Sequence, residues 1–424
     1  MTNPAGRFFA PLRHRRLALL FAGQVTSNVG DAVYAVALPW YVLATHGGAL
    51  LLGVVLAAYG VPRTALLVVG GHLADRWRPW TVMLAADTVR MAVVAGLAAM
   101  AFAGPARAAT LVPIAVVLGA GEGLFLPGAL SIVPSLVPGE ILQSANALTS
   151  SGSQMATLAG PILGGALVGA VSPGGAFAVD AATFAASAAT LLAIRRTRAA
   201  PAAAAAPPAP GQPDAAPAPP AGIGALLRRS RVLQVILLIT IAANLGSGGF
   251  GEVALPALAH GPLGAGATGY GALMAAMGAG ALVGTLVAGT MGTPKRVAVV
   301  ASAAFMIQSI FGAIVPYLGS VAPAAASLAL FGVCNGFGNV LTITAFQRWA
   351  PPALLGRIMG ILMTASFAAF PISVAAAGVL VHRFGPAPFF PLASAAVILA
   401  IAAGLTQREW REFGRNEAAA AAAT

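Results

Sequence analysis

The sequence predicts an all-α membrane protein of about twelve transmembrane helices in two six-helix bundles. Its 424 residues are 58% hydrophobic and 8% charged, whereas soluble globular domains carry about 25% charged residues. Twelve apolar runs can be placed along the chain, each long enough to cross a bilayer core, which takes about 20 residues. Almost all basic residues lie outside these runs, on one predicted side of the membrane.

The apolar runs fall into two groups of six, separated by an Ala/Pro-rich segment that cannot bury enough apolar surface to fold. The runs cover residues 17–44, 49–71, 80–103, 109–133, 144–171, 174–194, 231–258, 266–291, 295–318, 321–347, 354–381 and 385–406. The chain therefore divides into a cytoplasmic N-terminus (1–16), a first bundle (17–194), a cytoplasmic linker (195–230), a second bundle (231–406) and a cytoplasmic tail (407–424).

The placement of basic residues sets the expected orientation. All but four of the 23 Lys and Arg residues fall on the side that holds both termini; the exceptions are Arg63 and Arg90 within runs, and Arg107 and Arg383 on the other side. Because cytoplasmic loops are enriched in Lys and Arg, we expect both termini in the cytoplasm and a location in the cell membrane. The net charge of +12 is thus a topology signal, and we expect no nucleic-acid partner.

A short charged stretch, Gly70 to Arg78, separates the second and third runs. We expect a tight cytoplasmic turn here that makes the two runs antiparallel neighbours. A weaker signal of internal repetition comes from Val36-Ala37-Leu38-Pro39 and Val253-Ala254-Leu255-Pro256, which occupy matching positions in the two groups. This echo favours a parallel repeat of two similar bundles.

Several motifs resemble those of the major facilitator superfamily. The turn reads Gly71-x-x-x-Asp75-Arg76, like the loop signature of that superfamily, and the fifth run carries Gly152-x-x-x-Ala156-x-x-x-Gly160-Pro161-x-x-Gly164-Gly165, like its antiporter signature. Further matching features are Gly23-Gln24, Asn28-x-Gly30-Asp31, Asp87-x-x-Arg90, Asn146-Ala147-Leu148 and Gly356-Arg357. Together they resemble the drug exporter branch that includes macrolide and enterobactin efflux proteins.

The resemblance implies the major facilitator fold and transport by alternating access. It implies a gating loop made of Gly71, Asp75, Arg76 and Arg357, in which Asp75 latches onto the start of the eleventh run and stabilises the outward-open state. It also implies an antiporter-like motif of Gly152, Gly160, Pro161, Gly164 and Gly165. Within that motif, Gly160-Pro161 is expected to bend the fifth run and let it pack closely on the eighth.

Five ionisable residues lie well inside the first group of runs: Asp31, Arg63, Asp87, Arg90 and Glu122. A charge at mid-bilayer costs about 2.5–3.5 kcal/mol on insertion scales, so each needs a partner or a function. Depths estimated from the helical rise pair Arg63 with Asp87 and Arg90 with Glu122. The pairs could serve transport or simply neutralise one another and hold the helices together.

This pairing leaves Asp31 without a partner, on the same helix face as Gln24 and Asn28. A carboxyl group in a low-dielectric bundle can exchange protons near neutral pH. We therefore expect Asp31 to couple proton movement to transport, with Glu122 as the second candidate. The alternative is that Asp31 only forms a hydrogen bond to a neighbouring helix.

The second group of runs has no ionisable residue near mid-membrane, but it carries amides. Together with Gln24 and Asn28, we expect Asn244, Gln308, Asn335 and Asn339 to line a substrate cavity. With nearby phenylalanines, such a cavity suits a lipophilic solute. The predicted function is proton-antiport efflux of small lipophilic compounds; the alternatives are a siderophore or metabolite exporter and a polytopic membrane enzyme.

The sequence points to no enzyme site. The five histidines are scattered over loops and the ends of runs, so we expect no catalytic residues and no metal site. We also expect no cofactor. The expected partners are the lipid bilayer, protons and a small lipophilic substrate, and we expect a monomer.

Overall fold

The computed structural model describes residues 10–44, 47–105, 107–196, 230–291, 294, 296–349 and 352–413. The predicted linker (195–230) and tail (407–424) lie mostly outside these ranges. Helices make up the secondary structure of the described chain, with no strand among its elements. In the first group these are α2 (Arg15–Ala44), α3 (Gly48–Arg76), α4 (Pro79–Ala103), α5 (Ala108–Ile132), α6 (Gly139–Ala170) and α7 (Pro173–Arg196).

The second group contains α9 (Arg231–Gly249), which runs through η3 (Phe250–Ala254) into α10 (Leu255–His260). It continues with α11 (Gly266–Thr290), α12 (Val297–Ile314), α13 (Val321–Trp349), α14 (Pro352–Phe384) and α15 (Phe389–Thr406). The short elements are η1 (Ala10–Arg13), η2 (Val133–Ser135), η4 (Val315–Tyr317) and α16 (Arg408–Glu412). The predicted fold class, about twelve long helices, is confirmed. Below, the first half means α2–α7 and the second half means α9–α15.

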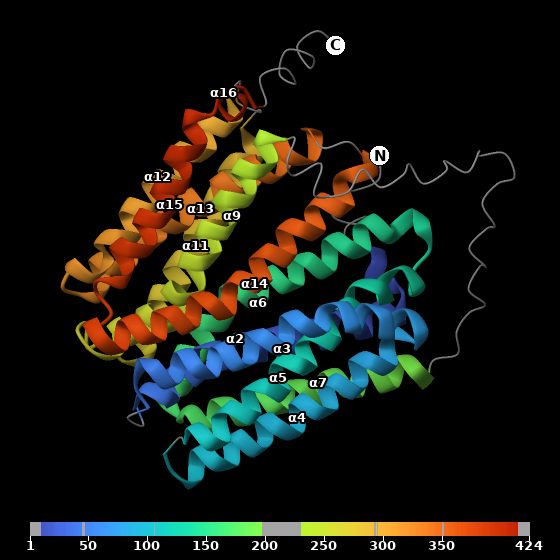
Figure 1. Ribbon diagram of the computed structural model, residues 1–424. Helices are drawn as coiled ribbons and strands as arrows, with labels where there is room; N and C mark the ends of the chain where they lie inside the picture. Colours follow the sequence, from blue (N-terminus) through green and yellow to red (C-terminus); the bar gives the residue numbers. More distant parts are fainter. Residues whose placement is uncertain are drawn as a thin grey trace, which may run out of the picture.

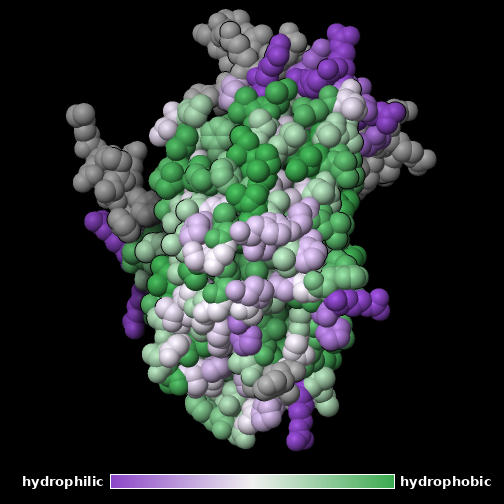
Figure 2. Space-filling view, turned by 90° about the vertical axis from the view of Figure 1, so that its left-hand side faces the viewer, coloured by the Kyte–Doolittle hydropathy of each residue, from purple (hydrophilic) through white to green (hydrophobic). Residues whose placement is uncertain are grey.

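Ten of the long helices are apolar and long enough to cross a membrane, by length and composition. The two others, α2 and α6, have 30 and 32 residues but carry polar side chains along much of their length. Large hydrophobic side chains are exposed on many helices, for example Leu399 at 70% and Leu130 at 73%. Figure 2 shows hydrophobic residues over much of one face, with strongly hydrophilic residues gathered mostly near its upper end and edges. Such a surface suits a multi-pass membrane protein.

The expected turn between the second and third runs is shorter than predicted. Helix α3 continues to Arg76, so most of the stretch from Gly70 is helical and the turn consists of Trp77 and Arg78. Nothing after Gly71 breaks the helix until Pro79, whose fixed φ and missing N–H place it at the first turn of α4.

Close packing joins α3 to α5, and α3 makes few contacts with its chain neighbour α4. Gly119 and Gly123 of α5 lie directly against the backbone of Tyr59 and Arg63, where a Cβ atom would collide with a carbonyl oxygen. Small residues at this spacing let transmembrane helices approach closely. The predicted neighbours α3 and α4 thus make few contacts with each other, because glycine positions, more than the length of the turn, decide which helix packs on α3.

The second half repeats this arrangement. Gly280 and Gly284 of α11 face Gly332 and Gly336 of α13 so closely that each would collide, if it had a Cβ, with a carbonyl oxygen of the other helix. Likewise α2 packs on α6 and α7 as α9 packs on α14 and α15, and α4 packs on α5 and α7 as α12 packs on α13 and α15. The helix pairings thus follow one plan twice.

The two halves meet through α3 against α14 and α6 against α11 (Figure 1). Several close contacts between the halves lie toward the end of the bundle that is away from the termini. Gly53 lies against Gly378, Gly165 lies against Gly271, and the ring of Trp40 meets that of His260 at 5.1 Å. Toward the middle of both helices, the Thr64 hydroxyl of α3 donates to the Phe367 carbonyl of α14 at 3.1 Å.

The seventh span contains a π-helical turn, η3, that contacts α2 and α3 of the first half. Four glycines precede or occupy it, at positions 246, 248, 249 and 251. The Tyr270 hydroxyl donates to the Gly251 carbonyl at 3.2 Å, and Phe250 stacks on Phe331 with ring centres 5.3 Å apart. Turns of this kind often mark functional positions in helices.

The first residues of the predicted tail are docked onto the second half. Trp410 of α16 is 3% exposed, its indole N–H donates to Ser302 of α12 at 3.3 Å, and its ring stacks on Phe413 at 5.6 Å. An amphipathic aromatic ring fits this position at the end of the bundle because it has both an apolar body and a donor.

Candidate functional site

Arg90 on α4 is the centre of a buried charge cluster in the first half. Its Nη2 donates to Asp87 Oδ1 at 3.1 Å, and its guanidinium carbon lies 4.2 Å from the ring centre of Phe184 and 5.0 Å from that of Phe125. Gly121 of α5 leaves room for the side-chain stem, since a Cβ there would lie 2.8 Å from Arg90 Cγ. The cation is therefore held by one carboxylate and two aromatic rings.

Asp87 is fully buried, at 0% exposed. Besides the contact with Arg90, its other carboxylate oxygen accepts a hydrogen bond from the Ser187 hydroxyl of α7 at 2.6 Å. A buried carboxylate with both oxygens bonded is well compensated. Asp87 thus joins α4 to α7 and fixes the position of Arg90.

A second ion pair links α3 to α5. Arg63 Nη2 lies 3.0 Å from Glu122 Oε1, and the two side chains are 22% and 24% exposed. The Arg63 guanidinium carbon also lies 4.8 Å from the ring centre of Phe367 in the second half and 5.9 Å from that of Tyr59. This pair therefore reaches the boundary between the halves.

The predicted pairings are corrected by these contacts. Arg63 pairs with Glu122 instead of Asp87, and Arg90 pairs with Asp87 instead of Glu122. The physical reason is the close α3–α5 packing at Gly119 and Gly123 described above. It places α5 beside Arg63, while Arg90 meets Asp87 one turn earlier on its own helix.

Asp31 is not isolated, contrary to the prediction. Its Oδ1 lies 3.9 Å from Arg90 Nη1, and its side chain is 46% exposed while that of Arg90 is 4% exposed. Of the two acids around Arg90, Asp31 is thus the more distant and the more exposed. The arrangement gives one buried arginine a close, buried carboxylate partner and a second, more accessible one.

Asp180 on α7 belongs to the same layer, although sequence reasoning assigned it no role. It is 1% exposed, and its Oδ1 lies against Gly30, next to Asp31. Its carboxylate contacts the Thr183 hydroxyl at 3.3 Å, and no arginine of the described chain lies within ion-pair distance. The pairing of Gly30 with a polar residue in α7 has no signal in a single sequence.

The predicted cavity amides take part in contacts between helices. Asn28 Nδ2 donates to Ser153 Oγ of α6 at 2.9 Å, and Asn244 Nδ2 donates to Ser366 Oγ of α14 at 3.2 Å. Asn335 donates to Gln308 of α12 at 3.3 Å, and Asn339 donates to Asn335 at 3.1 Å. Gln24 is half-buried on α2. Asn28, Asn244 and Asn335 therefore join helix pairs, whereas Asn339 bonds within α13. The role of all these amides toward a substrate stays a prediction.

The glycines of the antiporter-like motif are packing residues. Gly152, Gly160 and Gly164 face α2, against Val25, Ala32 and Val33 respectively, and Gly165 faces Gly271 of α11. A Cβ on Gly165 would lie 2.9 Å from the Gly271 Cα. Pro161 lies on the same face, since its carbonyl oxygen would be 2.6 Å from a Cβ on Gly271. The fifth span therefore approaches the eighth closely, as expected, but through Gly165 and the Pro161 carbonyl, whereas Gly160 faces α2. The expected bend stays a prediction.

The gating-loop residues are described only in part. Arg76 lies exposed at the last turn of α3. The surroundings of Gly71 and the side chains of Asp75 and Arg357 lie outside the described part of the structure, so the latch stays a prediction.

Chemically, the charge cluster can exchange protons and redistribute charge. Two acids with partial access, Asp31 and Glu122, each lie beside an arginine in an otherwise apolar bundle. Among the described residues, the Nε atoms of Arg63 and Arg90 have no hydrogen-bond partner, so both guanidiniums have unused donors. Protonating Glu122 would remove the carboxylate charge beside Arg63, whereas protonating Asp31 would leave Arg90 paired with Asp87.

Comparison with known proteins points to a family of membrane transporters. A family model described as transmembrane secretion effector matches residues 7–421. An uncharacterised MFS-type transporter, y4rN of Sinorhizobium fredii, is 26% identical over 396 residues, which cover 91% of this chain and 93% of that protein. The multidrug efflux pump Tap of Mycobacterium tuberculosis is 26% identical over 378 residues, or 87% of each chain.

Solved structures show the same fold. The nucleoside transporter NupG has a TM-score of 0.66 at 13% identity and covers 92% of this chain and 98% of its own. A bacterial homologue of the iron transporter ferroportin, in an inward-facing state, has a TM-score of 0.66 at 15% identity and covers 94% and 98%. Because the family model spans nearly the whole chain, the protein belongs to the transmembrane secretion effector family of the major facilitator superfamily.

Proposed function

We propose that this transporter exports small lipophilic compounds across the cell membrane by proton antiport, with both termini in the cytoplasm. The observation that carries the proposal is the charge cluster of the first half: two accessible acids, Asp31 and Glu122, each beside an arginine in an apolar bundle. Ionisable groups at this depth persist where they pair or serve ion movement. Similarity to a multidrug efflux pump supports the direction of transport and the class of substrate.

In this mechanism, a proton on Asp31 neutralises the more distant of the two carboxylates around Arg90. Arg90 stays bound to Asp87, which is buried and doubly bonded. A proton on Glu122 instead frees Arg63, whose guanidinium lies against Phe367 of α14. Protonation of Glu122 would therefore change a contact between the halves, and this change could couple protonation to their movement.

The arrangement of the halves fits a substrate-loading state. The described contacts between them gather toward the end away from the termini. In the proposed cycle, with the termini in the cytoplasm, the substrate-loading state has its central space open toward the cytoplasm. A lipophilic compound would then enter from the inside, and proton binding from the outside would reset the carrier.

Uptake of a fluorescent lipophilic dye into inside-out vesicles, with and without an imposed pH gradient, tests the proposal. We expect gradient-driven uptake by the wild type and its loss in Asp31→Asn. Glu122→Gln should shift the pH profile. Arg107→Gln, an exposed change near the start of α5, is the matched control and should transport normally. Full gradient-driven uptake by Asp31→Asn would show that Asp31 is not the proton-coupling group. Gradient-independent uptake by the wild type would show that transport is not proton antiport.

A further inference from the structure

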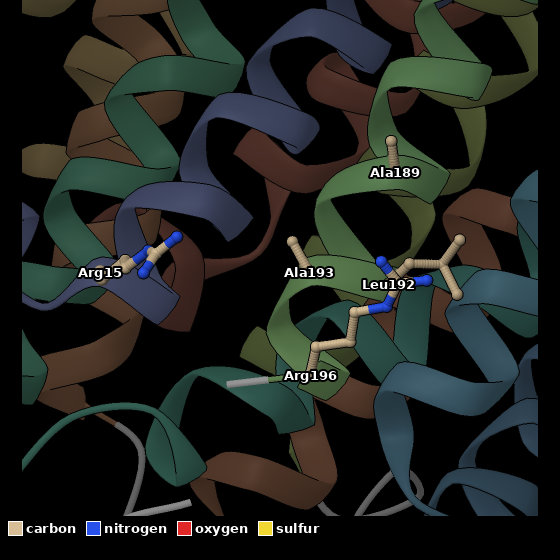
Figure 3. Close-up of a pocket in the computed structure, with 5 residues that line it drawn as sticks. All are labelled: Arg15, Ala189, Leu192, Ala193 and Arg196. Atoms are coloured by element: carbon tan, nitrogen blue, oxygen red, sulfur yellow. The ribbon is translucent and has the colours of Figure 1, made fainter. Parts of the chain in front are cut away.

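A groove lies between the first turn of α2 and the last two turns of α7, at the end of the bundle where the described chain begins. Its volume is about 390 Å³. Figure 3 shows Arg15 of α2 on one side and four residues of α7 on the other; in this view Ala193 points toward Arg15, whereas the side chains of Leu192 and Arg196 point away from it. The lining residues are Arg15, Ala189, Leu192, Ala193 and Arg196. None of them belongs to the charge cluster of the transport site.

The α7 side of this groove is an amphipathic stripe. Ala189, Leu192, Ala193 and Arg196 are spaced by three, one and three residues, which places them on one helix face. Leu192 is 38% exposed, and Ala189 is exposed as well. An exposed leucine on a spanning helix faces acyl chains, so the apolar part of the stripe borders lipid.

The charged part of the groove lies at the level of the lipid headgroups. Arg196 is the last residue of α7 and Arg15 the first of α2, and Ala189 lies about 10 Å deeper along the helix axis at the helical rise. Both arginine side chains are exposed, and neither forms an ion pair within the described chain. Among the described residues, the groove thus offers two cations without an ion-pair partner above an apolar wall.

We propose that this groove binds one anionic phospholipid of the cytoplasmic leaflet. Its phosphate is bound by Arg15 and by Arg196, whose exposed side chain turns toward Arg15, and an acyl chain lies along Leu192 and Ala189. Basic pockets between transmembrane helices on the cytoplasmic side suit such headgroups. A lipid bound here bridges the first and sixth spans at their cytoplasmic ends. The inference rests on the membrane orientation proposed above and does not depend on the transported substrate or on proton coupling.

Native mass spectrometry of the delipidated protein tests it by titration with phosphatidylglycerol and phosphatidylcholine of identical acyl chains. The wild type is expected to bind phosphatidylglycerol with clear preference. Each arginine near an anionic lipid contributes about fivefold in affinity, so Arg15→Gln/Arg196→Gln should weaken binding about 30-fold. Arg231→Gln is the matched control, because Arg231 begins α9 as Arg15 begins α2 and already donates to Gln234 at 2.9 Å.

Two further variants separate a built groove from general surface charge. Ala193→Trp fills the groove and keeps both cations, and it should also weaken binding. Arg15→Lys/Arg196→Lys keeps the charges and should retain most of the binding. The proposal is overturned if the Gln pair or Ala193→Trp binds phosphatidylglycerol like the wild type, or if millimolar inorganic phosphate displaces the lipid. Binding is measured without transport, so failed antiport leaves this result unaffected.

Discussion

The guanidinium of Arg63 lies 3.0 Å from the carboxylate of Glu122, on the face of α3 that meets the second half of the protein. Its other neighbour, the ring of Phe367, belongs to α14. One arginine therefore joins an ion pair within the first half to a contact between the halves. A change in the charge of Glu122 should therefore alter the contact between Arg63 and Phe367, at the boundary between the halves.

The first prediction concerns the strength of this pair. Breaking a fully buried ion pair costs about 3–5 kcal/mol; since Arg63 and Glu122 are each about a quarter exposed, Glu122→Gln should cost about 1–2 kcal/mol. Arg63→Gln/Glu122→Gln should cost less than the sum of the single changes, because the double variant leaves no unpaired charge. Thermal denaturation in detergent measures both, and simple additivity would show that the two groups do not interact.

The second prediction contrasts the two acids around Arg90. Asp87 is buried, lies 3.1 Å from the guanidinium and accepts from Ser187, so Asp87→Asn should destabilise the protein by about 3 kcal/mol. Asp31 is 46% exposed and 3.9 Å away, so Asp31→Asn should cost less than about 1 kcal/mol. Asp31→Asn is thus expected to lose coupling while it keeps its melting temperature. Equal losses of stability would contradict this division.

The spans could be predicted because a run of apolar residues has few alternatives in a membrane. The predicted start of the first span at residue 17 and the observed start of α2 at Arg15 differ by a single helical turn or less. The partners of the intramembrane charges could not be predicted from depth. Arg63 and Asp87 have similar estimated depths in the membrane and were therefore predicted to pair. The close packing of α5 on α3 at Gly119 and Gly123 instead brings Glu122 to Arg63.

A signal for that packing was present in the sequence. Gly119 and Gly123 are four residues apart, as are Gly332 and Gly336, and this spacing is typical of close helix pairs in membranes. The sequence does not show which helix is the partner, because the backbone of any helix at a suitable depth could pack against these glycines. Asp180 shows the same limit: its contact with Gly30 depends on how α2 and α7 cross.

The third prediction concerns the docked tail. Trp410 is 3% exposed and hydrogen-bonded to Ser302, so Trp410→Ala should destabilise the second half by about 3 kcal/mol or more. The control is Arg408→Gln on the same short helix. Arg408 pairs with Glu412 at an exposed site, and surface pairs contribute little, so the melting temperature should not change. A Trp410→Ala variant that melts like the wild type would show that the tail does not stabilise the bundle.

The fourth prediction tests the latch implied by the loop motif. Asp75→Asn removes the charge that would hold the end of α3 to the start of α14 in the outward-open state. The variant should fold normally but favour the inward-open state. Labelling of single cysteines placed on the cytoplasmic side, in a Cys334→Ser background, measures the shift. Unchanged labelling together with normal transport would rule the latch out.

The last prediction uses the contact between Gly165 of α6 and Gly271 of α11. A Cβ on Gly165 would lie 2.9 Å from the Cα of Gly271, and backbone cannot move aside as a side chain can. Gly165→Val should therefore oppose closure of the halves at the end away from the termini and favour the state that is open there. Gly96→Val is the control, since a Cβ on Gly96 of α4 meets no atom within 4 Å. Distances between spin labels on the ends of α6 and α11 should lengthen in Gly165→Val and stay unchanged in Gly96→Val. If both variants keep the wild-type distance, the halves do not need this glycine contact to close, and the motif must act through the packing of α6 on α2.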